Sequence, residues 1–332
     1  MARDVVAVVG GGVVGLSIAH ELAARGHDVT VVADRSAQES VSAVAAAIWF
    51  PYRAGASADL AGWLSRSLHR FGELSLDPAT GVDLRPGLVV ERRPDPDRSW
   101  TDALPHHTEA AAQDLPSGAT SGVRVTVPVI TTPVYLRWLA GRCAELGVRT
   151  VHRSLASVDE LHGLADVAVV AAGLRSGELL DDDSVFPVRG QVVRLANPGL
   201  THWVTDEDDP AGITYVIPRR EDVVVGGTAE TGSWDEGVDR EAERAMLSRA
   251  TALVPALDGL SVLSRAAGLR PARAAVRLER VPGRALPVLA CYGHGGAGVT
   301  LSWGCAEQVA DLVGAPRSDV TDSAYAGAPD ES

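Results

Sequence analysis

The chain has 332 residues, of which 46% are hydrophobic, so it is long enough to bury a sizeable core in one large or two smaller domains. Its formal net charge of −13 argues against a nucleic-acid partner, because phosphates are held by clustered Lys and Arg. No window of about 18 uninterrupted apolar residues is present, and we expect no membrane-spanning helix. The three cysteines, Cys143, Cys291 and Cys305, lack metal-type spacing, so we expect reduced core thiols, a cytoplasmic protein and no metal.

The first 35 residues read as a strand, a glycine turn, a helix and a second strand that ends in an acid. Gly10 makes the tight turn, Gly12 lets the backbone approach a pyrophosphate, and Gly15 allows the helix to pack closely on the strand. The N–H groups at the helix N-terminus suit phosphate oxygens. Asp34 lies 19 residues after Gly15, the spacing of a carboxylate that binds a ribose. This pattern predicts a dinucleotide-binding βαβ unit.

The middle of the chain alternates between two kinds of pattern. Residues 40–52 are a run of small residues ending in aromatics, which suits a backbone pressed against a flat ring; a buried helix is the alternative. Residues 53–131 are mixed, with short β-like stretches. Helical spacing over 134–146 and the apolar strand at 165–173 return to the nucleotide-binding pattern. Alternating stretches over 187–264, with one helix among them, predict an antiparallel sheet.

A second glycine loop, at Gly293, Gly295, Gly296 and Gly298, opens a helix near the end of the chain. Two such loops at opposite ends of one chain imply a cofactor that both ends contact. A nicotinamide dehydrogenase normally completes its dinucleotide site within one contiguous domain, whereas a flavin ring is commonly held by a late segment. The arrangement therefore favours FAD.

These patterns predict an α/β fold in which a Rossmann-like FAD-binding domain is interleaved with an antiparallel-sheet substrate domain. The expected FAD-binding domain takes residues 1–52, 132–186 and 265–316, the substrate domain takes residues 53–131 and 187–264, and residues 317–332 form a polar tail.

Several motifs in this order resemble the D-amino-acid oxidase family, which also contains D-aspartate oxidase and glycine oxidase. They extend from Val5 to about Gly314 and read VVGGGVVGLS, VAAAIWFPY, YLRWL, VRGQVVRL, TYVIPRREDVVVGGT, GLRPARAAVRLER and YGHGGAGVTLSWGCA. The resemblance implies FAD-dependent oxidation of a D-amino acid by dioxygen to a 2-oxo acid, ammonia and hydrogen peroxide. The D configuration follows from the resemblance alone.

The resemblance also implies a set of cofactor contacts. The adenosine diphosphate would meet Gly10, Gly12, Val13, Val14, Gly15, Asp34 and Arg35; the flavin would meet Ser42, Ala46, Ala47, Ile48 and Arg270; the adenine side would meet Leu155 and Gly173; the pyrimidine end would meet Gly295, Gly296, Gly298, Val299 and Thr300.

Three residues are expected to hold the substrate. Arg270 matches an arginine that clamps the α-carboxylate bidentately, a geometry suited to guanidinium. Tyr215 matches a phenol that donates to the same carboxylate, and the carbonyl of Gly296 would accept from the α-amino group. Together they would fix Cα over the flavin. A structural salt bridge for Arg270 and a core position for Tyr215 are the alternatives, and His294 is expected to be structural.

The chain departs from the family pattern at some positions. Ala211 stands where animal members carry a lid tyrosine, and Ala290, Cys291 and Ala297 also differ from the family signature. Ala229 replaces a basic residue, which favours neutral D-amino acids, although Arg219 and Arg220 could lie close enough to change this. D-aspartate oxidase, glycine oxidase, a nicotinamide dehydrogenase and a flavoprotein without turnover stay open as alternatives, as does a homodimer.

Overall fold

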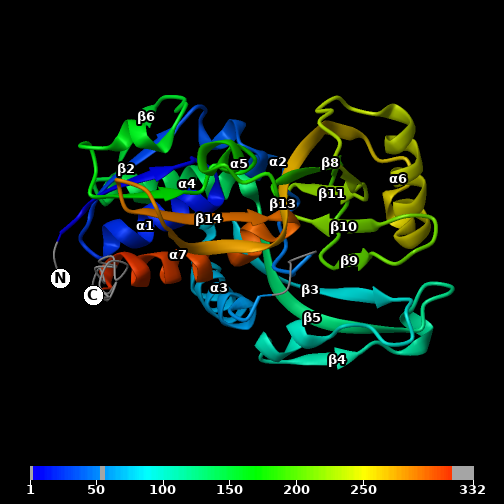
Figure 1. The fold of residues 1–332 in the computed structure, drawn as a ribbon. Helices are drawn as coiled ribbons and strands as arrows, with labels where there is room; N and C mark the ends of the chain where they lie inside the picture. Colours follow the sequence, from blue (N-terminus) through cyan, green and yellow to red (C-terminus); the bar gives the residue numbers. More distant parts are fainter. Residues whose placement is uncertain (1–2, 53–56, 316–332) are drawn as a thin grey trace, which may run out of the picture.

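The computed structural model describes residues 3–52 and 57–315 (Figure 1). Residues 53–56, at the start of the expected substrate domain, and the tail expected at 317–332 lie outside the described residues. The strands of the described part form one continuous mixed sheet. None of its helices is both long and apolar enough to cross a membrane.

One half of the sheet is parallel. Its strands, in spatial order, are β14 (Val288–His294), β7 (Val167–Val170), β1 (Val5–Val9), β2 (Asp28–Ala33) and β6 (Arg149–His152). β7 is an unbroken run of buried Val and Ala, as expected of a parallel strand covered on both faces. The prediction of a buried strand within residues 165–173 is confirmed.

Helices cover this parallel half. They are α1 (Val13–Ala24), α3 (Leu60–Leu74), α4 (Thr132–Glu145), α5 (Arg175–Leu180) and α7 (Gly298–Gly314). α7 packs against both α1 and α3 (Figure 1). The approach of α3 requires a glycine, because a Cβ on Gly304 would lie 2.3 Å from the Trp63 carbonyl oxygen. α3 therefore joins the parallel half, although it lies within the expected substrate segment 53–131.

The other half of the sheet is mostly antiparallel. Its strands are β4 (His107–Glu109), β5 (Ser121–Ile130), β3 (Val82–Glu91), β9 (Trp203–Asp206), β10 (Thr214–Pro218), β11 (Asp222–Gly226) and β8 (Phe186–Ala196), with β12 (Glu230–Thr231) paired to β8. β3 and β9 are the parallel exception. α6 (Arg240–Leu253) buries Met246 and Ala250 against this half.

The long strand β13 (Val262–Val281) joins the two halves (Figure 1). Its first part pairs with β8 up to Ala272, and its second part, after a register shift between Ala272 and Arg277, pairs with β14. One strand thus runs through the boundary expected at residue 265, and the division into two domains stays a prediction.

Short elements complete the chain. α2 (Val41–Val44) is a single helical turn, after which the backbone is held against β5: Trp49 N donates to Pro128 O and Ile130 N to Ala47 O, both at 2.8 Å. Residues 40–52 are therefore not one buried helix. The 3-10 turns lie at Ala37–Glu39, Pro78–Thr80, Ser99–Ala103, Ala112–Asp114, Val158–Leu161, Pro255–Leu257 and Gly295–Ala297.

Candidate active site

A cavity of about 560 Å³ runs from the end of β2 across the sheet to β10, a volume within the usual range of ligand sites. Nearly all predicted site residues line it: Gly10, Gly12, Val13, Val14, Asp34, Arg35, Ser42, Ala46, Ala47, Ile48, Leu155, Gly173, Tyr215, Arg270, Gly295, Gly296, Gly298, Val299 and Thr300. Gly15 is not among the lining residues. The tertiary structure thus brings together segments from both ends of the chain.

The first glycine loop places the N-terminus of α1 at the cavity. Gly10 has φ +123°, and a Cβ there would lie 2.3 Å from the Ala171 carbonyl oxygen. A Cβ on Gly15 would lie 2.0 Å from the Gly10 carbonyl oxygen, so Gly15 lets the helix approach the loop rather than facing the cavity. The positive end of the α1 dipole therefore points to where an anionic ligand such as a diphosphate can bind.

Asp34, directly after β2, offers an ionised carboxylate at one end of the cavity. It accepts hydrogen bonds from Arg35 Nη2 and Nε at 3.1 and 3.2 Å, and Arg175 Nη1 lies 4.0 Å away. The hydrogen bonds from Arg35 hold the pKa of Asp34 below its ordinary value. At neutral pH this carboxylate can accept hydrogen bonds from sugar hydroxyls.

The small-residue strip at residues 42–48, which begins within α2, is connected by hydrogen bonds to both ends of the chain. Ser42 Oγ accepts a hydrogen bond from Val13 N at 3.1 Å, at the start of α1. Thr300 Oγ1, on α7, donates to Phe50 O at 2.9 Å. Ala47 has φ +54°, an uncommon conformation for a residue with a side chain. The strip therefore forms a wall of backbone and small side chains that a planar ring could approach.

The second glycine loop follows β14 directly. Gly295 has φ +55°, and a Cβ on Gly296 would lie 2.2 Å from Cδ1 of Tyr52. The Tyr52 ring thus rests on the bare backbone of Gly296. Its position was not predicted from the sequence, although Tyr52 ends the small-residue run that was singled out.

Arg270 extends from β13 into the end of the cavity near β10. Its guanidinium lies on Gly190, where a Cβ would come within 2.2 Å of Nη1. Nη1 donates to the Thr228 carbonyl oxygen at 3.1 Å, and Cζ lies 5.7 Å from the centre of the Tyr52 ring. Among the described residues, Arg270 forms no ion pair with a carboxylate. A partly buried guanidinium of this kind is well suited to bind an anionic ligand.

Tyr215 lies on β10, beside the Arg270 side chain of β13. Its ring lies on Gly226 of β11, where a Cβ would come within 2.0 Å of Cζ. Burial raises the pKa of the Tyr215 phenol, although the neighbouring Arg270 charge and hydrogen bond oppose the shift. The phenol is therefore protonated at neutral pH and can donate a hydrogen bond into the cavity.

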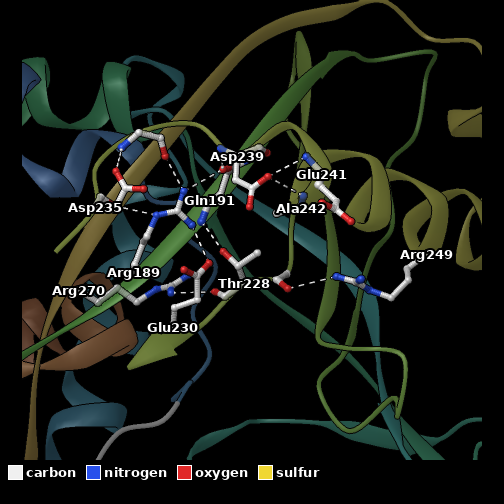
Figure 2. Close-up of polar contacts among 12 residues, drawn as sticks. Arg189, Gln191, Thr228, Glu230, Asp235, Asp239, Glu241, Ala242, Arg249 and Arg270 are labelled. Carbon is white, nitrogen blue, oxygen red and sulfur yellow. Dashed lines mark hydrogen bonds and ion pairs between the residues drawn. The ribbon is translucent and has the colours of Figure 1, made fainter. Parts of the chain in front are cut away.

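A polar network fixes the segment that carries Thr228 (Figure 2). Gln191 N donates to Thr228 Oγ1 at 2.7 Å. The buried Arg189 donates to Glu230 Oε1 at 2.7 Å and to the Asp235 carbonyl oxygen at 2.8 Å. Because these contacts anchor the segment to β8, the carbonyl that holds Arg270 is itself held in place.

The positions that sequence reasoning missed are mainly glycines. Gly190 and Gly226 lie inside strands and make room for the Arg270 guanidinium and the Tyr215 ring. A glycine within a strand pattern is a signal of close approach, and VRGQVVRL and DVVVGGT contain it. Thr228 has no comparable signal, because it contacts Arg270 through its backbone carbonyl oxygen, which every residue type has.

The two arginines that could have changed the side-chain preference are engaged elsewhere. Buried Arg219 pairs with Asp222 at 2.5 Å, and exposed Arg220 pairs with Asp83 at 2.8 Å. Neither lines the cavity. Ala211, at the expected lid position, is exposed in the turn between β9 and β10, outside the lining. Among the described residues, Arg270 is therefore the arginine that lines the cavity near β10.

Comparison with known proteins supplies a family. Residues 5–312 match the family described as FAD dependent oxidoreductase. A relative from Rubrobacter xylanophilus named D-amino-acid oxidase is 46% identical over 314 residues, covering 94% of this chain and 96% of the relative. A human protein named D-aspartate oxidase is 34% identical over 329 residues, covering 93% of this chain and 94% of its own length.

A solved structure of similar fold is glycine oxidase from Geobacillus kaustophilus. It has a TM-score of 0.77 and 22% sequence identity, and the match covers 94% of this chain and 95% of that one. At this identity the likeness concerns the fold alone, and it confirms the predicted fold class.

Proposed function

The chain belongs to the family of FAD-dependent oxidoreductases, and we propose that it oxidises neutral D-amino acids, with FAD as cofactor and dioxygen as electron acceptor, to 2-oxo acids, ammonia and hydrogen peroxide. The observation that carries this proposal is the pairing of Arg270 with the protonated phenol of Tyr215 at one end of the cofactor cavity. The name of the Rubrobacter xylanophilus relative supports it. Family membership disfavours the nicotinamide alternative.

The residues of the cavity fit FAD. The first glycine loop and the N-terminus of α1 would hold the diphosphate, and Asp34 the ribose. The strip at residues 42–48 would lie against the flavin, and the loop from Gly295 to Thr300 would bind its pyrimidine end. Bound there, FAD would supply an acceptor for hydride from the substrate Cα and a donor of two electrons to dioxygen.

The substrate would be held by its α-carboxylate and α-amino groups. Arg270 and Tyr215 donate to the carboxylate, and the carbonyl of Gly296 accepts from the amine. These contacts fix the direction of the Cα–H bond, so that reaction depends on positioning more than on a protein base. His294 takes no part as a base at Cα, because an amine that arrives neutral needs none. The resulting imino acid is hydrolysed by water.

A neutral side chain fits the rest of the pocket better than a carboxylate. Binding a second carboxylate would need a second cation, and Arg219 and Arg220 are paired with Asp222 and Asp83 outside the cavity. D-Aspartate is therefore expected to be a poor substrate.

A peroxide-coupled screen of the purified yellow protein tests the proposal. Neutral D-amino acids should give peroxide, whereas their L-enantiomers, D-aspartate and glycine should give little. Fastest turnover of D-aspartate or glycine would support one of those oxidases instead, and a yellow protein that makes no peroxide with any amino acid would support a flavoprotein without turnover.

Location and assembly are part of the proposal. All three cysteines are buried free thiols, which supports the cytoplasm. A homodimer is tested by light scattering on the flavin-loaded protein, where a single-chain mass would exclude it. Fractionation of cells that express the protein tests the location.

A further inference from the structure

Three side chains with metal-binding donors meet behind the second glycine loop. Cys291 and His294 lie on β14, and Cys305 lies on α7, so the glycine loop runs between them. Their donor atoms, two sulfurs and one imidazole nitrogen, all lie within 4.8 Å of one another. Cys291 and Cys305 are 0% exposed and His294 is 4% exposed. None of the three has a part in the proposed oxidation.

The donor set has the chemistry of a transition-metal site. Thiolate and imidazole are the ligands that Zn²⁺ and Cu⁺ prefer over oxygen donors. Zn–S bonds of about 2.3 Å in tetrahedral geometry place two sulfurs roughly 3.8 Å apart. Donors already within 4.8 Å could reach that geometry through side-chain shifts on the order of 1 Å.

A second observation points to a missing partner in the same cluster. Nε2 of His294 is buried and has no hydrogen-bond partner in the described part of the chain. A buried polar atom left without a partner destabilises the fold, and most such atoms in proteins are satisfied. Coordination of a metal through Nε2 would give this atom a partner and remove the penalty.

The cluster can be reached from the cavity. The third cysteine of the chain, which lies elsewhere, offers a control for its chemistry. Cys291 and His294 line the cavity, so an ion can arrive from that side. Cys143, the remaining cysteine, is also buried but lies on α4, where its Sγ donates to Leu16 O at 3.5 Å. It shares burial and thiol chemistry with the cluster but belongs to no such group of donors in the described residues.

We propose that Cys291, His294 and Cys305 form a three-ligand site for Zn²⁺ beside the cavity. Binding converts two thiols to thiolates and releases two protons, so that the charge of the ion is matched. The bound ion would cross-link β14 to α7 across the glycine loop. This inference goes beyond the proposed oxidation and replaces the expectation, from cysteine spacing, that the chain holds no metal.

Zinc stoichiometry of the flavin-loaded protein tests the site. Protein dialysed against Zn²⁺, then loaded with FAD and passed through a metal-free desalting column, should retain about one zinc per chain by mass spectrometry. The Cys143→Ala control should retain the same amount. The double variant Cys291→Ala/Cys305→Ala should retain at least about tenfold less, with its flavin absorbance as the check of folding. Equal zinc in the double variant and the control, or no zinc above the blank in the wild type, would overturn the proposal.

A measurement without variants keeps the test decisive if the double variant does not fold. Crystals of the wild-type protein soaked in Zn²⁺ should show an anomalous peak between Cys291, His294 and Cys305. Peaks confined to other positions, or no peak at all, would count against the site. Thermal unfolding gives a further readout, since a ligand that binds the native state alone raises the midpoint with rising Zn²⁺ concentration in the control and not in the double variant.

Discussion

In the parallel half of the sheet, backbone geometry shapes the cavity, whereas in the antiparallel half the groups that point into it are side chains. Gly10 and Gly15 pack the loop so tightly that a Cβ would meet a carbonyl oxygen within 2.3 Å at each position. On the other side, Arg270 and Tyr215 lie on Gly190 and Gly226 and are held by residues of several strands. A diphosphate needs N–H groups and a dipole, which a loop and a helix supply, whereas a carboxylate needs a placed guanidinium.

Gly10→Ala should have the largest effect, because it changes the glycine loop in the parallel half, where the backbone shapes the cavity. The new Cβ would lie 2.3 Å from Ala171 O at φ +123°, so the loop must move. We expect the protein to purify without flavin, as read from its absorbance. Gly141→Ala, in α4, is the matched control, since a Cβ on Gly141 would have no atom within 4 Å. Full flavin content in Gly10→Ala would show that the loop tolerates displacement and that the contrast between the halves is overstated.

Arg270→Ala should leave the flavin in place and remove substrate binding. Loss of a charge-assisted clamp is expected to lower kcat/KM by about 10²- to 10³-fold. Arg270→Lys keeps the charge but not the fork, and we expect it to recover only part of the loss. Steady-state kinetics with flavin-saturated protein measure both. A near-normal kcat/KM in Arg270→Ala would show that the arginine does not bind the substrate carboxylate and has a structural role.

Gly226→Ala makes the same substitution in the antiparallel half, where side chains point into the cavity. The Cβ would lie 2.0 Å from Cζ of Tyr215, so the ring must leave its position. We expect flavin to be retained and kcat/KM to fall by about 10- to 100-fold, close to the effect of Tyr215→Phe. If Gly226→Ala lost flavin instead, the two halves would not act separately. Since the pKa of Tyr215 is raised, the Tyr215→Phe effect should be constant from pH 7 to pH 9.

Asp182→Asn should change stability and leave turnover nearly intact. Burial opposes its ionisation, but hydrogen bonds from Ser184 and Tyr292, together with Arg273, hold the pKa of Asp182 at about 2. A carboxyl whose pKa is about 3.9 when unfolded and lower when folded stabilises the native state above pH 4, and this contribution is lost between pH 4 and 2. The variant should lose about 2 kcal/mol of unfolding free energy at pH 7, and denaturant titrations should show the difference shrinking toward pH 2. A difference that is independent of pH would exclude this origin.

Much of the cofactor half could be read from the sequence. The first glycine loop, its helix and the acid at Asp34 are contiguous, and glycine, helix and strand signals each act over short distances. The strand predicted at residues 165–173 contains the observed strand Val167–Val170 for the same reason. The contacts of Arg270 with Gly190 and of Tyr215 with Gly226 were not predicted, because they depend on which strands become neighbours.

Local pattern was thus enough to specify a dinucleotide site, a flavin from the pair of glycine loops, and, through resemblance, an amino-acid oxidase. Folding was needed to bring Tyr52 onto Gly296, to direct Arg220 toward Asp83, and to join Cys291 and His294 with Cys305. The physical reason is the distance along the chain over which each interaction acts. Turn, helix and strand preferences are set by adjacent residues, whereas the partner of a charge, ring or thiol is set by strand order and helix packing across the whole sheet.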